Sequence, residues 1–79
     1  MKIAIIGLGY VGIQLATGLG RQYATMGFDL DAAKVAAYEA GEDPTGEVSN
    51  AQLADANHLG FTTEPDDLRG YDVYIVAVP

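Results

Sequence analysis

Three glycines, Gly7, Gly9 and Gly12, follow directly on an Ile-rich run at residues 2–6 and constrain the fold more than any other feature. A short apolar run that ends at a glycine is typical of a strand buried on both faces. Beyond the glycines, apolar residues recur at the spacing of a helix, at Val11, Leu15, Ala16 and Leu19. The spacing Gly7-x-Gly9-x-x-Gly12 therefore predicts a strand that turns sharply into a helix.

Strands and helices are expected to alternate along the rest of the chain. Asp31 and Ser49 are the expected N-caps of the second and third helices. The patterns predict strands at residues 2–6, 23–30, 59–63 and 71–78 and helices at residues 11–21, 32–40 and 50–57. Such alternation predicts an α/β fold, namely a three-layer Rossmann-type partial domain with a parallel sheet of about four strands in the order 3-2-1-4.

Each glycine of the turn has a separate physical task in a fold of this type. Gly7 permits the tight turn, Gly9 lets the backbone approach a pyrophosphate, and Gly12 lets the helix pack close to the strand. The free backbone N–H groups at the helix start then face the phosphates, and the helix dipole assists them. This attraction is local, so that an acidic chain can bind an anionic cofactor.

Asp29 lies 22 residues after Gly7, at the predicted end of the second strand. Dinucleotide-binding folds place an acid about 20 residues after the glycines, where it accepts hydrogen bonds from the ribose hydroxyls. A carboxylate repels a 2′-phosphate, and no arginine stands at residues 28–33 to bind one. The sequence therefore predicts NAD as the cofactor rather than NADP.

Charge and composition exclude several classes of function. The chain has 11 acidic and 4 basic side chains and a net charge of −7, which argues against binding to nucleic acid or to an anionic membrane surface. Its 79 residues form at most one small domain. Without cysteine, the chain contains no disulfide, no cysteine-ligated zinc and no thiolate nucleophile. No cluster of histidine and carboxylates suggests a metal site.

The apolar run near the N-terminus differs from a secretory signal. Gly7, Gly9 and Gly12 interrupt it, one basic residue precedes it, and no small-x-small cleavage site follows. It is also far shorter than the roughly 20 residues of a membrane span. We therefore expect a cytoplasmic protein.

The remaining polar and aromatic residues favour ordinary structural roles. By spacing alone, Lys34 is a surface residue of the second helix and His58 a solvated loop residue. The tyrosines Tyr38, Tyr71 and Tyr74 are expected to pack rather than to take part in chemistry.

The stretch KIAIIGLGYVG at residues 2–12 resembles the N-terminal segment of the UDP-glucose/GDP-mannose dehydrogenase family. The likeness continues through residues 27–31 and ends at residues 72–79, which resemble the family's fourth strand and the loop after it. Residues 21–30 and 72–79 are most similar to the branch that oxidises UDP-N-acetylhexosamines. In this family, an NAD-dependent enzyme oxidises C6 of a nucleotide sugar to a carboxylate in two hydride transfers.

The resemblance implies roles for several single residues. Tyr10 and Val11 would lend backbone amides to the pyrophosphate, and Lys34 would lie near the adenosine ribose. Val78 and Pro79 would lie against the nicotinamide side of the cofactor.

The family's catalytic cysteine and lysine and its sugar-binding domain lie beyond residue 79, so we assign no catalytic residue. Residues 1–79 are interpreted as the N-terminal part of an NAD(P)-binding Rossmann domain from a longer enzyme, and a UDP-sugar would bind only to that parent. Two alternatives stay open. One is a non-catalytic nucleotide-binding module, and the other is a different dehydrogenase or a flavoprotein with the same fingerprint.

In the predicted strand order, the strand at residues 73–78 lies at an open edge of the sheet. An apolar open edge can pair with a second copy of the chain. We therefore expect self-association or poor solubility through this strand.

Overall fold

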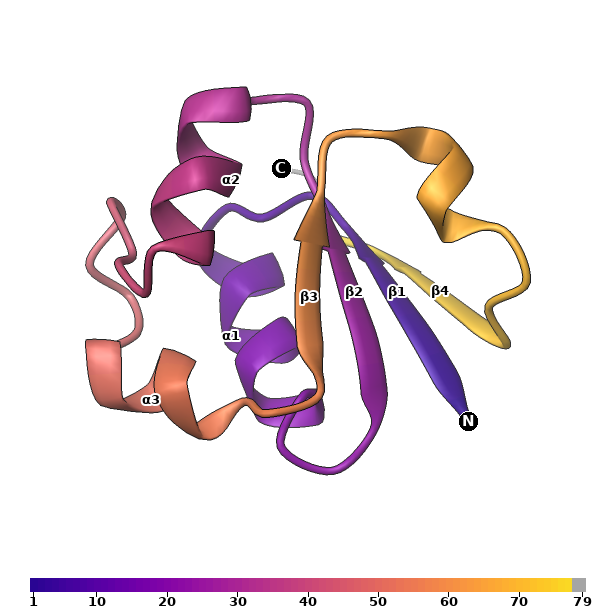
Figure 1. The fold of residues 1–79 in the computed structure, drawn as a ribbon, viewed down its shortest axis with the longest axis horizontal. Helices are drawn as coiled ribbons and strands as arrows, with labels where there is room; N and C mark the ends of the chain where they lie inside the picture. The colour runs from indigo at the N-terminus through magenta and orange to yellow at the C-terminus, as the bar shows by residue number, and fades with distance from the viewer. Residues whose placement is uncertain (78–79) are drawn as a thin grey trace.

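Four parallel strands form one sheet in the computed structural model, which describes residues 1–77. Their order is β3-β2-β1-β4 (Figure 1), which confirms the predicted α/β fold and strand order. Along the chain the elements are β1 (Lys2–Ile6), α1 (Tyr10–Leu19), β2 (Ala24–Phe28), α2 (Ala32–Glu39), α3 (Asn50–Asp55), β3 (Leu59–Thr62), the 3₁₀ helix η1 (Pro65–Leu68) and β4 (Val73–Val76).

Strand β1 lies in the middle of the sheet and pairs with both β2 and β4. Ile3 stands opposite Thr25 of β2 and Val73 of β4. Ile3, Ala4 and Ile5 are all buried, which confirms the prediction of a strand covered on both faces. Because all four strands are parallel, the segments that follow β1, β2 and β4 meet at one edge of the sheet, where folds of this type bind their ligands.

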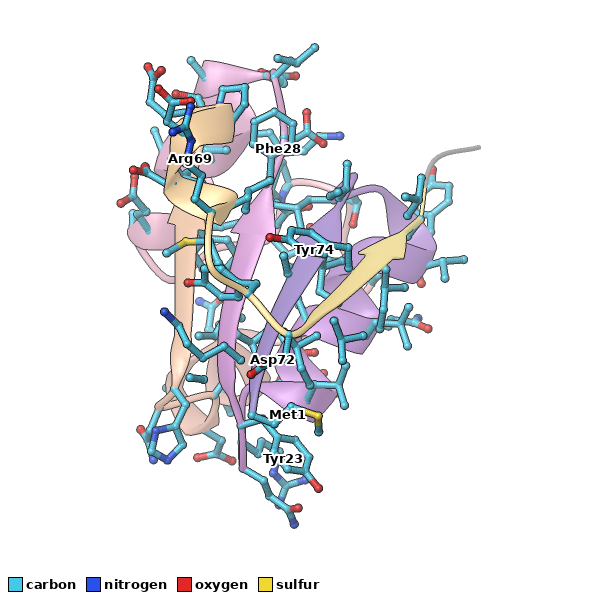
Figure 2. The ribbon with its side chains drawn as sticks, turned by 90° about the vertical axis from the view of Figure 1, so that its right-hand side faces the viewer. Met1, Tyr23, Phe28, Arg69, Asp72 and Tyr74 are labelled. Atoms are coloured by element: carbon cyan, nitrogen blue, oxygen red, sulfur yellow. The ribbon has the colours of Figure 1, made fainter. Side chains whose placement is uncertain are left out.

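The three α-helices lie on one face of the sheet, and η1 lies on the other (Figure 1). Figure 2 looks onto the face with η1, where the Tyr74 side chain extends from β4 and its hydroxyl donates a hydrogen bond to the Leu68 carbonyl oxygen, 2.6 Å away. The predicted three-layer fold has helices on both faces of the sheet. Within residues 1–77, η1 is the only helix on this second face.

Helix α1 is confirmed, but its buried face differs from its apolar stripe. The buried positions are Gly12, Ile13, Ala16 and Thr17, whereas Val11 is 62% exposed. The cause is the close contact between α1 and the loop before it, which brings the backbone of Gly12 against Gly7 and thereby sets the rotation of the helix. The helix also ends at Leu19, before the predicted end at residue 21.

The other boundaries agree closely with the sequence. Strand β2 ends at Phe28, so that Asp29 follows the strand directly. The two predicted caps are confirmed, because the side chains of Asp31 and Ser49 each accept a hydrogen bond from the backbone N–H three residues on, at 3.1 Å. The last strand was predicted at residues 71–78 and is observed at Val73–Val76.

Candidate dinucleotide-binding site

The glycine loop connects β1 to α1, and the fold itself requires two of its three glycines. Gly7 has a φ of +102°, a conformation that side chains rarely adopt, and its N–H donates to the Phe28 carbonyl oxygen at 2.8 Å. At Gly12, an added Cβ would lie 1.7 Å from the Gly7 carbonyl oxygen. The tight turn and the close approach of the helix therefore account for these two positions, as predicted from the motif.

Gly9 is different, because nothing in the described protein requires a glycine there. Its φ of −77° is open to any residue, and an added Cβ would meet no atom of residues 1–77 within 4 Å. As far as residues 1–77 are concerned, the space beside Gly9 is therefore open. A glycine at this place is explained if a bound molecule lies where the Cβ would be, as a pyrophosphate does in dinucleotide-binding folds.

The backbone N–H groups beside this open space are free to bind an anion. The first hydrogen bond of α1 runs from the Ile13 N–H to the Gly9 carbonyl oxygen at 3.0 Å. The N–H groups of Tyr10, Val11 and Gly12 consequently have no acceptor among residues 1–77. In the described part of the chain, no side chain caps the helix, and no acidic residue lies in its first turn. The positive end of the helix dipole thus faces the open space.

Asp29 lies beside the glycine loop, and two backbone N–H groups hold its carboxylate. Oδ2 accepts from the Leu8 N–H and Oδ1 from the Asp31 N–H, both at 2.9 Å. Partial burial raises the pKa of Asp29, but the N–H groups and the Lys34 ammonium outweigh burial and keep the pKa below its usual value. Asp29 is therefore a fixed anion at the edge of the loop.

Lys34 belongs to the first turn of α2, and the Asp31 cap brings it close to Asp29. The Lys34 ammonium lies 3.9 Å from the Asp29 Oδ2 atom. Spacing alone had indicated an ordinary surface position, whereas the structure leaves only 25% of this side chain exposed. The fold thus gathers Gly9, Asp29 and Lys34 at one edge of the sheet, while Val78 and Pro79 lie outside the described residues.

One residue of this region was not identified from the sequence. Tyr38 of α2 was expected only to pack, yet its hydroxyl donates a hydrogen bond to the Leu8 carbonyl oxygen in the glycine loop, at 2.7 Å. Burial and the charges of Asp43 and Asp29 raise the pKa of Tyr38, which further favours the protonated hydroxyl that donates this hydrogen bond. The only signal in the sequence was a tyrosine on the buried side of a predicted helix.

A separate cleft of about 290 Å³ lies between α1 and α3, away from the glycine loop. Glu47 and Asp55 line it together with Arg21. Two carboxylates would repel the phosphates of a dinucleotide, so the glycine loop is the better candidate site.

Among residues 1–77, no three histidine, aspartate or glutamate side chains are grouped to hold a metal ion, and no helix is long and apolar enough to cross a membrane.

The sequence profile described as "UDP-glucose/GDP-mannose dehydrogenase family, NAD binding domain" matches residues 1–79. The chain belongs to this family. The match confirms the resemblance noted in the sequence and the prediction of NAD as the cofactor of this domain. It also decides against a flavoprotein.

Relatives within the family share a substantial part of the sequence. The chain is 42% identical over 79 residues to a UDP-N-acetyl-D-glucosamine 6-dehydrogenase of Pseudomonas aeruginosa and 38% identical over 79 residues to one of Salmonella typhi. These alignments cover 100% of the chain but 19% of each relative. The chain thus spans about a fifth of the length of the curated relatives that it matches.

Solved structures of family members have the same fold. A GDP-mannose dehydrogenase from Pseudomonas aeruginosa, solved as a ternary complex, is 30% identical and superposes with a TM-score of 0.86, covering 100% of this chain and 20% of that one. A UDP-D-ManNAc dehydrogenase from Pyrococcus horikoshii is 25% identical, with a TM-score of 0.87, and covers 99% and 20%.

Proposed function

We propose that this chain is the N-terminal, cofactor-binding part of a longer nucleotide-sugar 6-dehydrogenase, which oxidises the C6 hydroxyl of a UDP-sugar to a uronate with NAD. The open space beside Gly9 carries the proposal, because a bound pyrophosphate explains a glycine that the protein itself does not need. The family and the two UDP-N-acetyl-D-glucosamine 6-dehydrogenases among the relatives support the reaction and the substrate class.

The glycine loop is proposed to bind the pyrophosphate of NAD. Gly7 and Gly12 shape the loop, Gly9 makes room, and the free amides of Tyr10 and Val11 bind the pyrophosphate. When bound, NAD supplies the acceptor for the hydride that leaves the sugar. This chain contains no cysteine, so a thiol that traps the aldehyde for a second oxidation must come from the rest of the parent.

Asp29 and Lys34 are proposed to bind the adenosine ribose. The carboxylate can accept hydrogen bonds from the ribose hydroxyls, and its negative charge disfavours a 2′-phosphate at the same place. The Lys34 ammonium lies 3.9 Å from the Asp29 carboxylate, whose negative charge partly neutralises the lysine. Lys34 therefore attracts a phosphate less strongly than an unpaired lysine would.

The charge of Asp29 gives a prediction about cofactor choice. Asp29→Asn keeps a side chain of the same shape but removes the charge and one of the two oxygens that accept backbone hydrogen bonds. We expect the preference for NAD over NADP to fall about tenfold. Titration calorimetry with both cofactors measures this ratio. Asp31→Asn is the matched control, because asparagine is also a good N-cap and the same charge is lost two residues away. An unchanged ratio in Asp29→Asn would remove Asp29 from the ribose site.

Self-association through β4 is also proposed. Within residues 1–77, β4 pairs only with β1, and Val73, Tyr74 and Val76 are 37%, 48% and 65% exposed. A second copy can pair with this edge and cover these side chains. We expect light scattering at high concentration to detect dimers and Val76→Lys to abolish them, because a lysine opposes edge pairing. A strictly monomeric wild-type chain would refute the proposal.

The cytoplasmic location predicted from the sequence remains a proposal. It is supported by the structure of the N-terminal apolar run, which forms the central strand β1 and so is part of the folded domain rather than a removable signal. Cell fractionation tests it, and recovery of the protein outside the cytoplasm would refute it.

A further inference from the structure

Tyr38 connects α2 to the glycine loop by a single buried hydrogen bond. The side chain is 2% exposed, and its ring stacks on Phe61 of β3 with a centroid distance of 5.3 Å. This packing fixes the ring, so that the hydroxyl has a defined position from which it donates to the Leu8 carbonyl oxygen at 2.7 Å. A rigid side chain thus holds one particular carbonyl of the loop.

Leu8 is held at three points. Its side chain is fully buried and lies over Gly27, where an added Cβ would come within 3.0 Å of the Leu8 Cδ2 atom. Its N–H donates to the Asp29 Oδ2 atom at 2.9 Å, and its carbonyl accepts from Tyr38. The backbone on either side of Leu8 therefore has little freedom to rotate.

The peptide bond after Leu8 determines where the Gly9 N–H points. A peptide unit is planar and trans, so its C=O and N–H groups point in opposite directions. Because Tyr38 draws the Leu8 carbonyl inward, the Gly9 N–H is directed away from Tyr38. The Gly9 N–H has no acceptor among residues 1–77, and Gly9 borders the open space of the loop.

We propose that Tyr38 is a positioning residue for the cofactor loop: its hydroxyl fixes the Leu8–Gly9 peptide so that the Gly9 N–H faces the pyrophosphate. This inference rests on the proposed function, because it assigns the pyrophosphate to the Gly9 loop. Without the hydroxyl, the Leu8 carbonyl would lose its partner and the peptide could rotate more, so that NAD binding would have to order the Gly9 N–H.

Tyr38→Phe tests the role because it keeps the ring and removes only the hydroxyl. We expect NAD to bind about three- to tenfold more weakly, the effect of one lost hydrogen bond. Tyr74→Phe is a matched control, since it removes a hydroxyl that donates to the Leu68 carbonyl oxygen on the opposite face of the sheet (Figure 2). Both variants are compared at a temperature where thermal melting shows them to be folded. Equal NAD affinity of Tyr38→Phe and wild type would overturn the proposal.

A second measurement separates this inference from the proposed function. In ¹⁵N-labelled protein without NAD, Tyr38→Phe should shift and broaden the Gly9 amide resonance, whereas Tyr74→Phe should leave it unchanged. A Gly9 resonance that is the same in Tyr38→Phe and wild type would overturn the positioning role. If wild type itself failed to bind NAD, the proposed function would fail, and the ligand-free resonance would still decide whether Tyr38 orders the loop.

Discussion

Gly12→Ala is expected to destabilise the protein by about 3 kcal/mol or more, a large part of the total stability of a chain of this size. The new Cβ would lie 1.7 Å from the Gly7 carbonyl oxygen and 2.8 Å from the Gly7 carbonyl carbon. These are backbone atoms of the turn, so they cannot move aside as the end of a flexible side chain can. Urea unfolding followed by circular dichroism measures the loss.

Gly18→Ala is the matched control for this experiment. Gly18 lies in the same helix, is exposed, and has no atom within 4 Å of an added Cβ. Alanine is about 1 kcal/mol more favourable than glycine inside a helix, so this variant should be as stable as wild type or more so. Equal unfolding midpoints for Gly12→Ala and wild type would show that α1 does not pack against the turn as described.

Gly9→Ala is expected to have the opposite profile, with the fold retained and NAD binding lost. The backbone of Gly9 suits alanine, and the Cβ meets no atom within 4 Å in the described part of the chain, so we expect a loss of stability of about 1 kcal/mol at most, from the poorer N-cap. The same methyl group would occupy the space proposed for the pyrophosphate. We expect NAD affinity to fall at least about tenfold by titration calorimetry.

Gly18→Ala again serves as the control, because it adds a methyl group to α1 away from the loop and should bind NAD as wild type does. Undiminished NAD affinity in Gly9→Ala would mean that the cofactor does not approach this residue. The contrast between Gly12 and Gly9 thus separates a glycine required by folding from one proposed for binding.

Sequence reasoning succeeded where the fold depends on local rules. The strand order follows from the alternation of strands with helices and from right-handed connections, and the caps at Asp31 and Ser49 follow from residue type and position. The position of Asp29 beside the loop follows from its distance along the chain from Gly7.

Features that depend on distant packing were harder to predict. The exposure of Val11 follows from the contact of Gly12 with Gly7, which sets the rotation of α1 and which hydrophobic periodicity does not encode. The hydrogen bond from Tyr38 to Leu8 joins residues 30 positions apart. It exists because α2 packs over the loop and Phe61 fixes the tyrosine ring, and no local pattern specifies either arrangement.

Binding of the NAD pyrophosphate at the Gly9 loop can be followed by titrating ¹⁵N-labelled protein with NAD. We expect the largest amide shifts at Gly9, Tyr10 and Val11, whose N–H groups have no acceptor among residues 1–77 and face the open space. Unchanged resonances at these three residues would contradict it, and so would shifts confined to the cleft lined by Glu47 and Asp55.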